Sequence, residues 1–308
     1  MKKLPLLLSF VLLLTALVCG ALAEPVYQVG EQVNGFTVTD TREFELIGAD
    51  VITLRHDQTG AQVMLLMNED TNRVFDITFR TVAEDNAGEA HVFEHATLDG
   101  SASYPSKELF FNLSSQTYNT YMNASTYPFM TTYPVASLSE AQLLKYADFY
   151  LDSCFNPMIY EDESIFKEEA WRYSLTSADD DLELTGTVYN EMLGAYTLER
   201  AASFNVFLTA FPGSTAGNVS GGRPDAITDL SWEQVCAYHD TYYHPSNSLT
   251  CVYGKLEDPG AFLELLNTVF SAYEEKDCSE LFADEGYQPL EASVTAVYEY
   301  GTEAGSDP

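Results

Sequence analysis

The stretch HVFEHATLDGSASYP, residues 91–105, places two histidines and a glutamate within roughly one turn of a predicted helix. The whole chain of 308 residues has only five histidines, so the cluster is unusual. Residues four apart on a helix share a face, and His91 and His95 can therefore direct two imidazole nitrogens at one point. Such a pair suits zinc, whose nitrogen ligands lie about 2.0–2.1 Å away. Glu94 is next to that point and could move a proton without binding the metal.

A catalytic zinc site also needs a third protein ligand and an open fourth position. Glu168, Glu169 and Glu191 all lie on predicted helices, and spacing alone does not choose among them. Glu169 can equally be a solvated charge on a helix face. A single H-x-x-E-H match also arises by chance, so the rest of the sequence has to decide whether the cluster is a metal site.

Short β-rich segments open the fold between residues 35 and 82. GFTVTDTREFELI, VITLRHD, AQVMLLMN and RVFDITFRTV are separated by turn signals, which predicts antiparallel strands. We expect Asn86 to cap the helix that carries the histidines, with Glu89 as its reciprocal partner, and the helix to stop at Asp99-Gly100. The segment TYNTYMNASTYPFMTTYPV predicts two more strands around Asn123.

Amphipathic helices dominate the second half of the sequence. In residues 139–155, SEAQLLKYADFYLDSCF, the apolar residues recur at helical spacing. On a helix they share one face: Leu143, Ala147, Tyr150, Leu151 and Cys154. Further segments predict helices at Glu163–Tyr173, Thr187–Thr197, Trp232–Tyr243 and Asp258–Tyr273. The segment SLTCVYG predicts a strand between the last two. Strands first, then helices interrupted by strands, indicate an α+β fold with an antiparallel sheet flanked by helices.

The composition indicates a globular protein with a strong negative charge. Apolar residues make up 46% of the chain, which is enough for a sizeable core, and the formal net charge is −33. Such a field repels nucleic acid and would attract cationic peptides or metal ions, but solubility outside the cell is the better explanation of the charge. The N-terminus combines Lys2, Lys3, an apolar run and Ala21-Leu22-Ala23, which predicts a cleaved signal peptide. We therefore expect an extracytoplasmic protein with no nucleic-acid partner and no stable membrane anchor.

Three segments are predicted along the chain. Residues 1–23 are expected to be the signal peptide, residues 24–275 the domain that carries the candidate catalytic zinc site, and residues 276–308 an acidic linker with the start of a truncated second domain at SVTAVYEYGT. No closely spaced pair occurs among the remaining cysteines, Cys154, Cys236, Cys251 and Cys278, and export would make disulfides possible. Cys154 and Cys251 fall in apolar patterns, so buried free thiols are expected at least as readily as disulfides. The histidines outside the cluster are expected to be structural, at positions His56, His239 and His244.

Six ordered motifs between residues 87 and 250 decide the family. They are AHVFEHATLDGSASYPSKELF, NTYMNASTYPFMTTYPVAS, FKEEAWRY, GTVYNEMLGAYT, SGGRPDAI and YYHPSNS. Together they resemble the inverted-zinc metallopeptidases of the insulinase (pitrilysin, M16) family, above all its presequence-protease branch. The resemblance can be followed loosely from about Gly35 to the end of the chain. It implies the LuxS/MPP-like metallohydrolase domain as the fold.

The resemblance also implies a zinc endopeptidase that cleaves short unstructured peptides, with one zinc ion per chain. It implies His91, His95 and Glu191 of NEMLGAY as the zinc ligands. Glu94 matches the family's catalytic base, which assists attack by zinc-bound water. These four positions all match the family's motif.

The family's substrate-binding strand resembles the segment around Asn123. The resemblance implies that Met122, Asn123 and Ala124 form a strand edge along which the peptide backbone pairs. An ordinary structural strand is an equally good interpretation of these three residues. Asn190 and Tyr196 flank the third ligand and could orient its carboxylate, although ordinary polar positions on a helix explain them better.

This chain is shorter than the members of the family that it resembles. Members resemble a clamshell whose two halves enclose the peptide, so the resemblance implies a C-terminal half as partner, in cis or as a separate subunit. A non-catalytic homologue that binds peptide or serves in assembly is the alternative function, but the intact H-x-x-E-H and Glu191 argue against it. A zinc-storage protein would need a histidine-rich tract that this sequence lacks.

Overall fold

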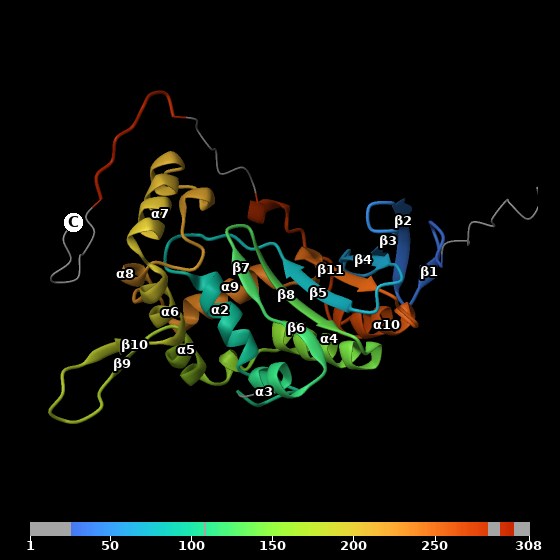
Figure 1. The fold of residues 1–308 in the computed structure, drawn as a ribbon, viewed down its shortest axis with the longest axis horizontal. Helices are drawn as coiled ribbons and strands as arrows, with labels where there is room; N and C mark the ends of the chain where they lie inside the picture. Colours follow the sequence, from blue (N-terminus) through green and yellow to red (C-terminus); the bar gives the residue numbers. More distant parts are fainter. Residues whose placement is uncertain (1–25, 108, 283–289, 299–308) are drawn as a thin grey trace, which may run out of the picture.

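The computed structural model describes residues 26–107, 109–282 and 290–298, and one nine-stranded sheet runs through its centre (Figure 1). The strand order is β1-β2-β3-β4-β11-β5-β8-β6, and β7 pairs with β8. The strands are β1 (Gln32–Val33), β2 (Phe36–Phe44), β3 (Ala49–His56), β4 (Gln62–Met67), β5 (Arg73–Phe79), β6 (Asn119–Met122), β7 (Ser125–Tyr127), β8 (Met130–Ser137) and β11 (Ser248–Gly254).

Strand β11 enters the sheet between two strands that are neighbours in sequence. It pairs parallel with β4, where Thr250 faces Val63, and antiparallel with β5, where Thr250 faces Ile77. The other strand pairs of this sheet, within the described residues, are antiparallel, as the sequence predicts. The insertion could not be predicted from local patterns, because it depends on residues more than 150 positions apart. The α+β class with helices flanking the sheet is confirmed.

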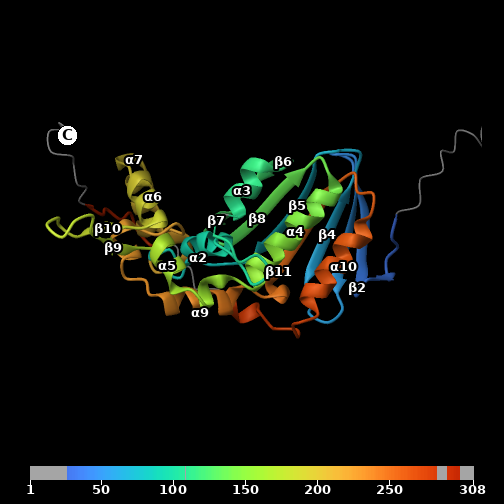
Figure 2. The same ribbon diagram turned by 90° about the horizontal axis from the view of Figure 1, so that it is seen from below.

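Helices cover one face of the sheet and one end of it (Figure 2). Helices α4 and α10 lie on the face to which β5 presents Phe75, Ile77 and Phe79, all fully buried. The helices are α2 (Glu89–Leu98), α3 (Leu109–Gln116), α4 (Glu140–Phe155), α5 (Glu163–Glu169), α6 (Thr187–Ala195), α7 (Leu198–Ala210), α8 (Pro224–Ile227), α9 (Trp232–Tyr242) and α10 (Pro259–Phe270). Short 3-10 turns are η1 (Met158–Tyr160), η2 (Thr215–Gly217), η3 (Pro245–Asn247) and η4 (Ser279–Phe282). A separate hairpin, β9 (Arg172–Ser174) and β10 (Glu183–Thr185), projects beside α5 and α6.

Several expected elements are confirmed, and others differ. Helix α4 begins where predicted, with the Ser139 side chain accepting a hydrogen bond from the Gln142 amide, and its five predicted core residues are buried. Three strands rather than two surround Asn123, because the chain turns again before β8. Helices α3 and α7 were not predicted, since each exposes large apolar side chains, Phe111 in α3 and Leu198, Val206 and Phe207 in α7, which blurs the pattern of one buried face.

The start of α2 is not the predicted capping box. Gly88 occupies the N-cap in the left-handed region (φ 82°), and no side chain caps the helix. Asn86 instead accepts a hydrogen bond from the Val219 amide through its side chain and another from the Arg223 amide through its backbone carbonyl. A Cβ placed on Gly88 would lie 2.8 Å from the Gly222 Cα. The histidine-bearing helix therefore begins at a close backbone-to-backbone contact, which leaves no space for a capping side chain.

We expect Gly88→Ala to destabilise the protein more than an equivalent change at an open site. Its left-handed backbone costs an alanine about 1–2 kcal/mol, and the contact with Gly222 adds a clash that only backbone movement can relieve. Gly30→Ala is the matched control, because Gly30 has a similar φ of 86° and nothing within 4 Å of the added Cβ. Urea unfolding of both variants measures the difference. Equal loss of stability would show that the contact at the start of α2 can relax.

Parts of both chain ends lie outside the described residues. The predicted signal peptide, residues 1–23, lies outside the described residues, as do residues 299–308. Residues 293–298 of the expected C-terminal strand belong to no strand. All four cysteines within the described chain are free thiols, two of them buried. None of the helices described between residues 26 and 298 combines the length and apolar character needed to cross a bilayer.

Candidate metal centre

Helix α2 presents the two histidines on the face opposite its core contacts. Val92, Phe93 and Ala96 are fully buried, and the Phe93 ring stacks on His239 of α9 with 4.7 Å between ring centroids. His91 and His95 project from the other side, and their ring centroids are 4.9 Å apart. The apolar stripe therefore anchors the helix, and the i, i+4 spacing sets the two imidazoles side by side.

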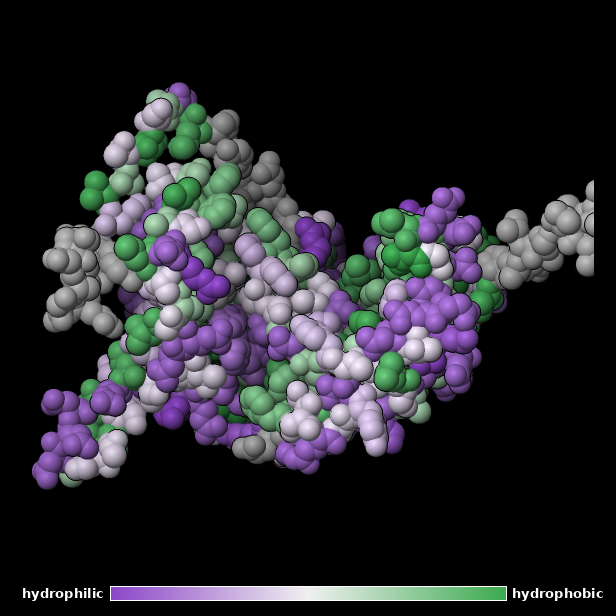
Figure 3. All heavy atoms as spheres, viewed as in Figure 1, coloured by the Kyte–Doolittle hydropathy of each residue, from purple (hydrophilic) through white to green (hydrophobic). Residues whose placement is uncertain are grey.

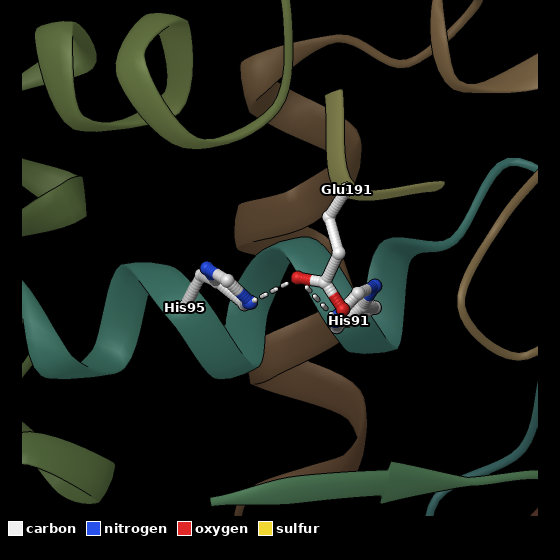
Figure 4. Close-up of side chains that lie close together, drawn as sticks. All are labelled: His91, His95 and Glu191. Carbon is white, nitrogen blue, oxygen red and sulfur yellow. Dashed lines mark ion pairs between the residues drawn. The ribbon is translucent and has the colours of Figure 1, made fainter. Parts of the chain in front are cut away.

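Glu191 brings a carboxylate to the two imidazoles from α6 (Figure 4). Its Oε2 lies 3.9 Å from His91 Nε2 and 3.6 Å from His95 Nε2. The three donor atoms all lie within 4.8 Å of one another. Among the described residues, His91, His95 and Glu191 form the group of histidine, cysteine or acidic side chains whose donor atoms are close enough together to hold a metal ion.

Hydrogen bonds behind the histidines fix which nitrogens face Glu191. His91 Nδ1 lies 3.1 Å from the Gly221 carbonyl oxygen, and His95 Nδ1 lies 3.0 Å from Glu169 Oε2. Both partners are acceptors, so both Nδ1 atoms must donate, and the Nε2 lone pairs are left for a metal. Ligands around a tetrahedral zinc ion lie about 3.3 Å apart, and the Glu191 oxygen lies only slightly farther than this from each Nε2, at 3.6 and 3.9 Å. The residues present therefore fit a zinc ion.

Glu169 has a different role from the third ligand that spacing alone allowed. Its Oε1 accepts a hydrogen bond from Thr187 Oγ1 at 3.1 Å, while its Oε2 holds His95. Burial lowers the pKa of His95, but the hydrogen bond and the charge of Glu169 outweigh it, so the pKa is raised. Asp99 also lies against Glu169, and burial followed by that charge raises the pKa of Asp99 to about 7. Glu168 points elsewhere, to Lys107 Nζ at 3.0 Å.

Glu94 lies in the same space without joining the three donor atoms. Its side chain is buried, and its Oε2 accepts a hydrogen bond from Thr126 Oγ1 of β7 at 2.6 Å. Burial raises the pKa of Glu94, an effect that the hydrogen bond from Thr126 and the nearby histidines oppose. A carboxylate with a raised pKa, fixed through one oxygen, leaves its other oxygen available to take up a proton.

A cavity of about 760 Å³ joins these residues to the expected substrate strand. The predicted site residues that line it are His91, Glu94, His95, Asn123, Ala124 and Glu191. Helix α7 and turn η2 form the opposite wall. The structure thus gathers six of the seven predicted site residues around one space.

Met122 is the predicted residue that does not line the cavity, because its side chain is buried in the core. The Asn123 amide donates to the Pro134 carbonyl, and the Asn123 carbonyl accepts from the Tyr150 hydroxyl. Strand β6 is the last in the sheet order, and no described strand pairs with its outer side. An open edge is present, but the backbone groups of Asn123 already have partners.

The residues beside the third ligand, Asn190 and Tyr196, have other partners in the structure. Asn190 donates to Thr185 Oγ1, and Tyr196 stacks on Phe204. Sequence reasoning missed Thr126 and Gly221, which contact Glu94 and His91. Only the motif SGGRPDAI pointed toward Gly221, and nothing in the local sequence indicated Thr126.

We expect Glu169→Gln to weaken zinc binding about 10–100-fold, the usual effect of losing a carboxylate behind a histidine ligand. The amide keeps the shape but removes the charge that raises the pKa of His95. Glu163→Gln is the matched control, because Glu163 lies on the same helix and pairs with Lys167. Competition with a chelating dye measures the affinity of each variant. Unchanged affinity in Glu169→Gln would show that its hydrogen bond does not support the site.

Comparison with known proteins places these features in a family. The sequence model of the insulinase family, peptidase family M16, matches residues 80–202. Protein HypA of Clostridium perfringens is 37% identical over 235 residues, 76% of this chain and 24% of that protein. Presequence protease 1, chloroplastic/mitochondrial, of Arabidopsis thaliana is 38% identical, over 72% of this chain and 21% of that protein. The mitochondrial presequence protease of Mus musculus is 35% identical, over 80% of this chain and 24% of that protein. The chain spans about a quarter of the length of these relatives.

The crystal structure of pitrilysin shares the fold, with a TM-score of 0.62 over 86% of this chain and 26% of that one, at 17% identity. The comparisons correct one expectation. Similar proteins are named mitochondrial or chloroplastic presequence proteases, so the extracytoplasmic location expected from the N-terminus is wrong. The H-x-x-E-H helix, the converging Glu191 and these matches agree. The chain belongs to the insulinase (peptidase M16) family, in its presequence-protease-like branch.

Proposed function

We propose that this chain carries the zinc-binding and proton-transfer residues of an endopeptidase that hydrolyses short, unstructured peptides. One observation carries the proposal above all. Two Nε2 lone pairs and the Glu191 carboxylate converge beside Glu94, within a cavity bordered by the end of a sheet. Hydrolysis of a peptide bond needs an electrophilic metal, a base and a place for the peptide backbone, and these residues are suited to supply all three.

His91, His95 and Glu191 would hold one zinc ion per chain. When bound, zinc supplies Lewis-acid chemistry, polarising a carbonyl and lowering the pKa of water. Glu94 accepts the proton from the attacking water and passes it to the leaving amine. Thr126 holds one oxygen of Glu94, so the carboxylate keeps its orientation as the proton moves. Burial favours the protonated form of Glu94 and so makes the carboxylate a stronger base.

The peptide would lie between the β6–β7 side of the cavity and α7. The outer side of β6 offers backbone groups to an extended chain, and Asn123 and Ala124 border the cavity directly. Backbone pairing tolerates varied side chains and requires an unfolded substrate. The backbone amide and carbonyl of Asn123 are already hydrogen-bonded within the chain. We therefore propose that the peptide backbone pairs with neighbouring backbone groups, and that the Asn123 side chain contacts the peptide.

The alternative is a non-catalytic subunit that binds peptide or serves in assembly. Such a protein would have no use for a buried Glu94 carboxylate, whose desolvation is unfavourable. In the family the site lies between two halves. We therefore propose that a C-terminal half, in cis or as a separate subunit, closes the cavity and excludes water.

Hydrolysis of a quenched fluorogenic peptide tests the function. The zinc-loaded chain is expected to cleave an unstructured peptide slowly, to lose this activity in a chelator, and to regain it when zinc is restored. Adding a C-terminal half from a presequence protease is expected to increase the rate. Cleavage that persists after zinc removal, or no cleavage with both halves present, would contradict the proposal. Equal rates with and without the second half would show that one domain suffices.

A further inference from the structure

Helix α7 forms the cavity wall that faces the β7 strand. Four of its residues line the space, Arg200, Ser203, Phe204 and Phe207. Their spacing of three, four and seven residues places them on one helical face. Figure 3 shows hydrophobic side chains gathered over α7, and Phe207 is 49% exposed. The wall therefore combines one cationic side chain with an apolar surface open to the cavity.

The guanidinium of Arg200 has no hydrogen bond or ion pair within the described chain. This is unusual in a protein with 47 acidic and 14 basic residues, where an exposed arginine readily finds a carboxylate. The other arginines all interact within the chain, namely Arg42, Arg55, Arg73, Arg80, Arg172 and Arg223. Glu94 and Glu191 line the same cavity, and neither pairs with Arg200.

The position of Arg200 in its helix also favours an anion from outside. It is the third residue of α7, after the N-cap Thr197, where the helix dipole is positive. A cation there is disfavoured by the dipole, whereas an anion bound to it is stabilised by both the guanidinium and the helix end. Neither packing nor the dipole accounts for an arginine at this place, but an anionic ligand does.

We propose that Arg200 is a specificity residue that binds a carboxylate of the peptide substrate, while Phe204 accepts an apolar side chain nearby. The inference rests on the proposed peptidase function. Along α7, Arg200 and Phe204 are about 6 Å apart, and side chains two residues apart on an extended peptide are about 6.6–7 Å apart. An extended peptide that runs along α7 can therefore contact both residues, with a carboxylate at position i beside Arg200 and an apolar side chain at position i+2 beside Phe204. The carboxylate is either an acidic side chain or the C-terminal group.

Peptide binding to the zinc-loaded Glu94→Gln chain tests this without turnover. Three labelled peptides differ only in charge: one has Glu two residues from Leu and an amidated C-terminus, one has Gln in place of Glu, and one has that Gln with a free C-terminus. We expect the Glu peptide or the free-C-terminus peptide to bind about tenfold more tightly than the neutral one. The tighter of the two identifies the source of the carboxylate.

Variants of Arg200 show whether it causes the preference. Arg200→Gln should abolish the preference without weakening the neutral peptide, Arg200→Lys should retain part of it, and Arg200→Glu should reverse it in favour of a Lys peptide. Arg42→Gln is the control, because Arg42 is exposed and lies on β2. Zinc content and circular dichroism check that each variant is folded.

Equal affinity for all three peptides, or no binding of any, would overturn the assignment of Arg200. So would an equal loss for charged and neutral peptides in Arg200→Gln, since that result indicates a structural role. Failure of the proposed function is a separate result, namely no cleavage by the zinc-loaded chain and its second half with Glu94 intact. Charge preference in binding does not depend on cleavage, so the two failures are distinguishable.

Discussion

Replacing Glu94 with glutamine is expected to leave zinc bound and to reduce peptide cleavage by about 10²–10⁴-fold. Glutamine keeps the size of the side chain and the hydrogen bond from Thr126, but it cannot accept the proton. Because Glu94 is not among the three converging donor atoms, metal content should not change. Cleavage of the fluorogenic peptide and elemental analysis of the same preparation measure both effects.

Glu89→Gln is the matched control for this variant. Glu89 is a buried carboxyl on the same helix, its pKa is raised to about 7 by burial, and it does not line the cavity. Its substitution should therefore leave cleavage nearly unchanged. Full activity in Glu94→Gln would remove the proposed proton transfer, and an equal loss in both variants would indicate general damage to α2.

Glu191→Gln is expected to release most of the zinc, with a larger loss of affinity than Glu169→Gln shows. It removes a charged ligand itself, whereas Glu169 acts only through the His95 ring. Binding should also weaken as pH falls, because His95 has a raised pKa and its proton competes with the metal. Metal competition assays over a range of pH measure both effects.

Glu168→Gln is the control for the third ligand. Its carboxylate pairs with Lys107 and lies outside the converging group, so zinc occupancy should be kept. If Glu191→Gln retained full occupancy while Glu168→Gln or Glu169→Gln lost it, the third ligand would be misassigned.

Local patterns predict the elements of this fold better than their arrangement. The helix from Ser139 was predictable, because its apolar spacing and its cap lie within one short segment. The position of β11 between β4 and β5 was not, since pairing such as that of Thr250 with Val63 depends on the whole sheet. The start of α2 was also missed, because the contact of Gly88 with Gly222 joins residues far apart in sequence.

The same division holds for the candidate site. His91, Glu94 and His95 lie within one helical turn, so their convergence follows from helix geometry alone. The hydrogen bonds that hold them join residues 130, 32 and 74 positions apart, to Gly221, Thr126 and Glu169. Spacing carries no information about such contacts.

Helix α7, which forms the cavity wall opposite the strand edge, could not be predicted from the sequence for a different reason. Helix α7 exposes Leu198, Val206 and Phe207 to the surroundings, so its pattern is not that of a helix with one buried face. As long as α7 is not predicted, the sequence does not distinguish Arg200 from any other charged residue on the surface. The cavity makes Arg200 a candidate for substrate contact, because this residue lines a space of about 760 Å³ together with the candidate metal ligands.

X-ray absorption at the zinc K-edge, recorded on the zinc-loaded chain, tests the central claim most directly. The arrangement of His91, His95 and Glu191 predicts one zinc per chain, with two imidazole nitrogens and a carboxylate oxygen at about 2.0–2.2 Å. Glu191→Gln should lose this signal or replace the carboxylate contribution. A sulfur shell at about 2.3 Å, or a spectrum without imidazole scattering, would place the metal elsewhere in the chain and contradict the account.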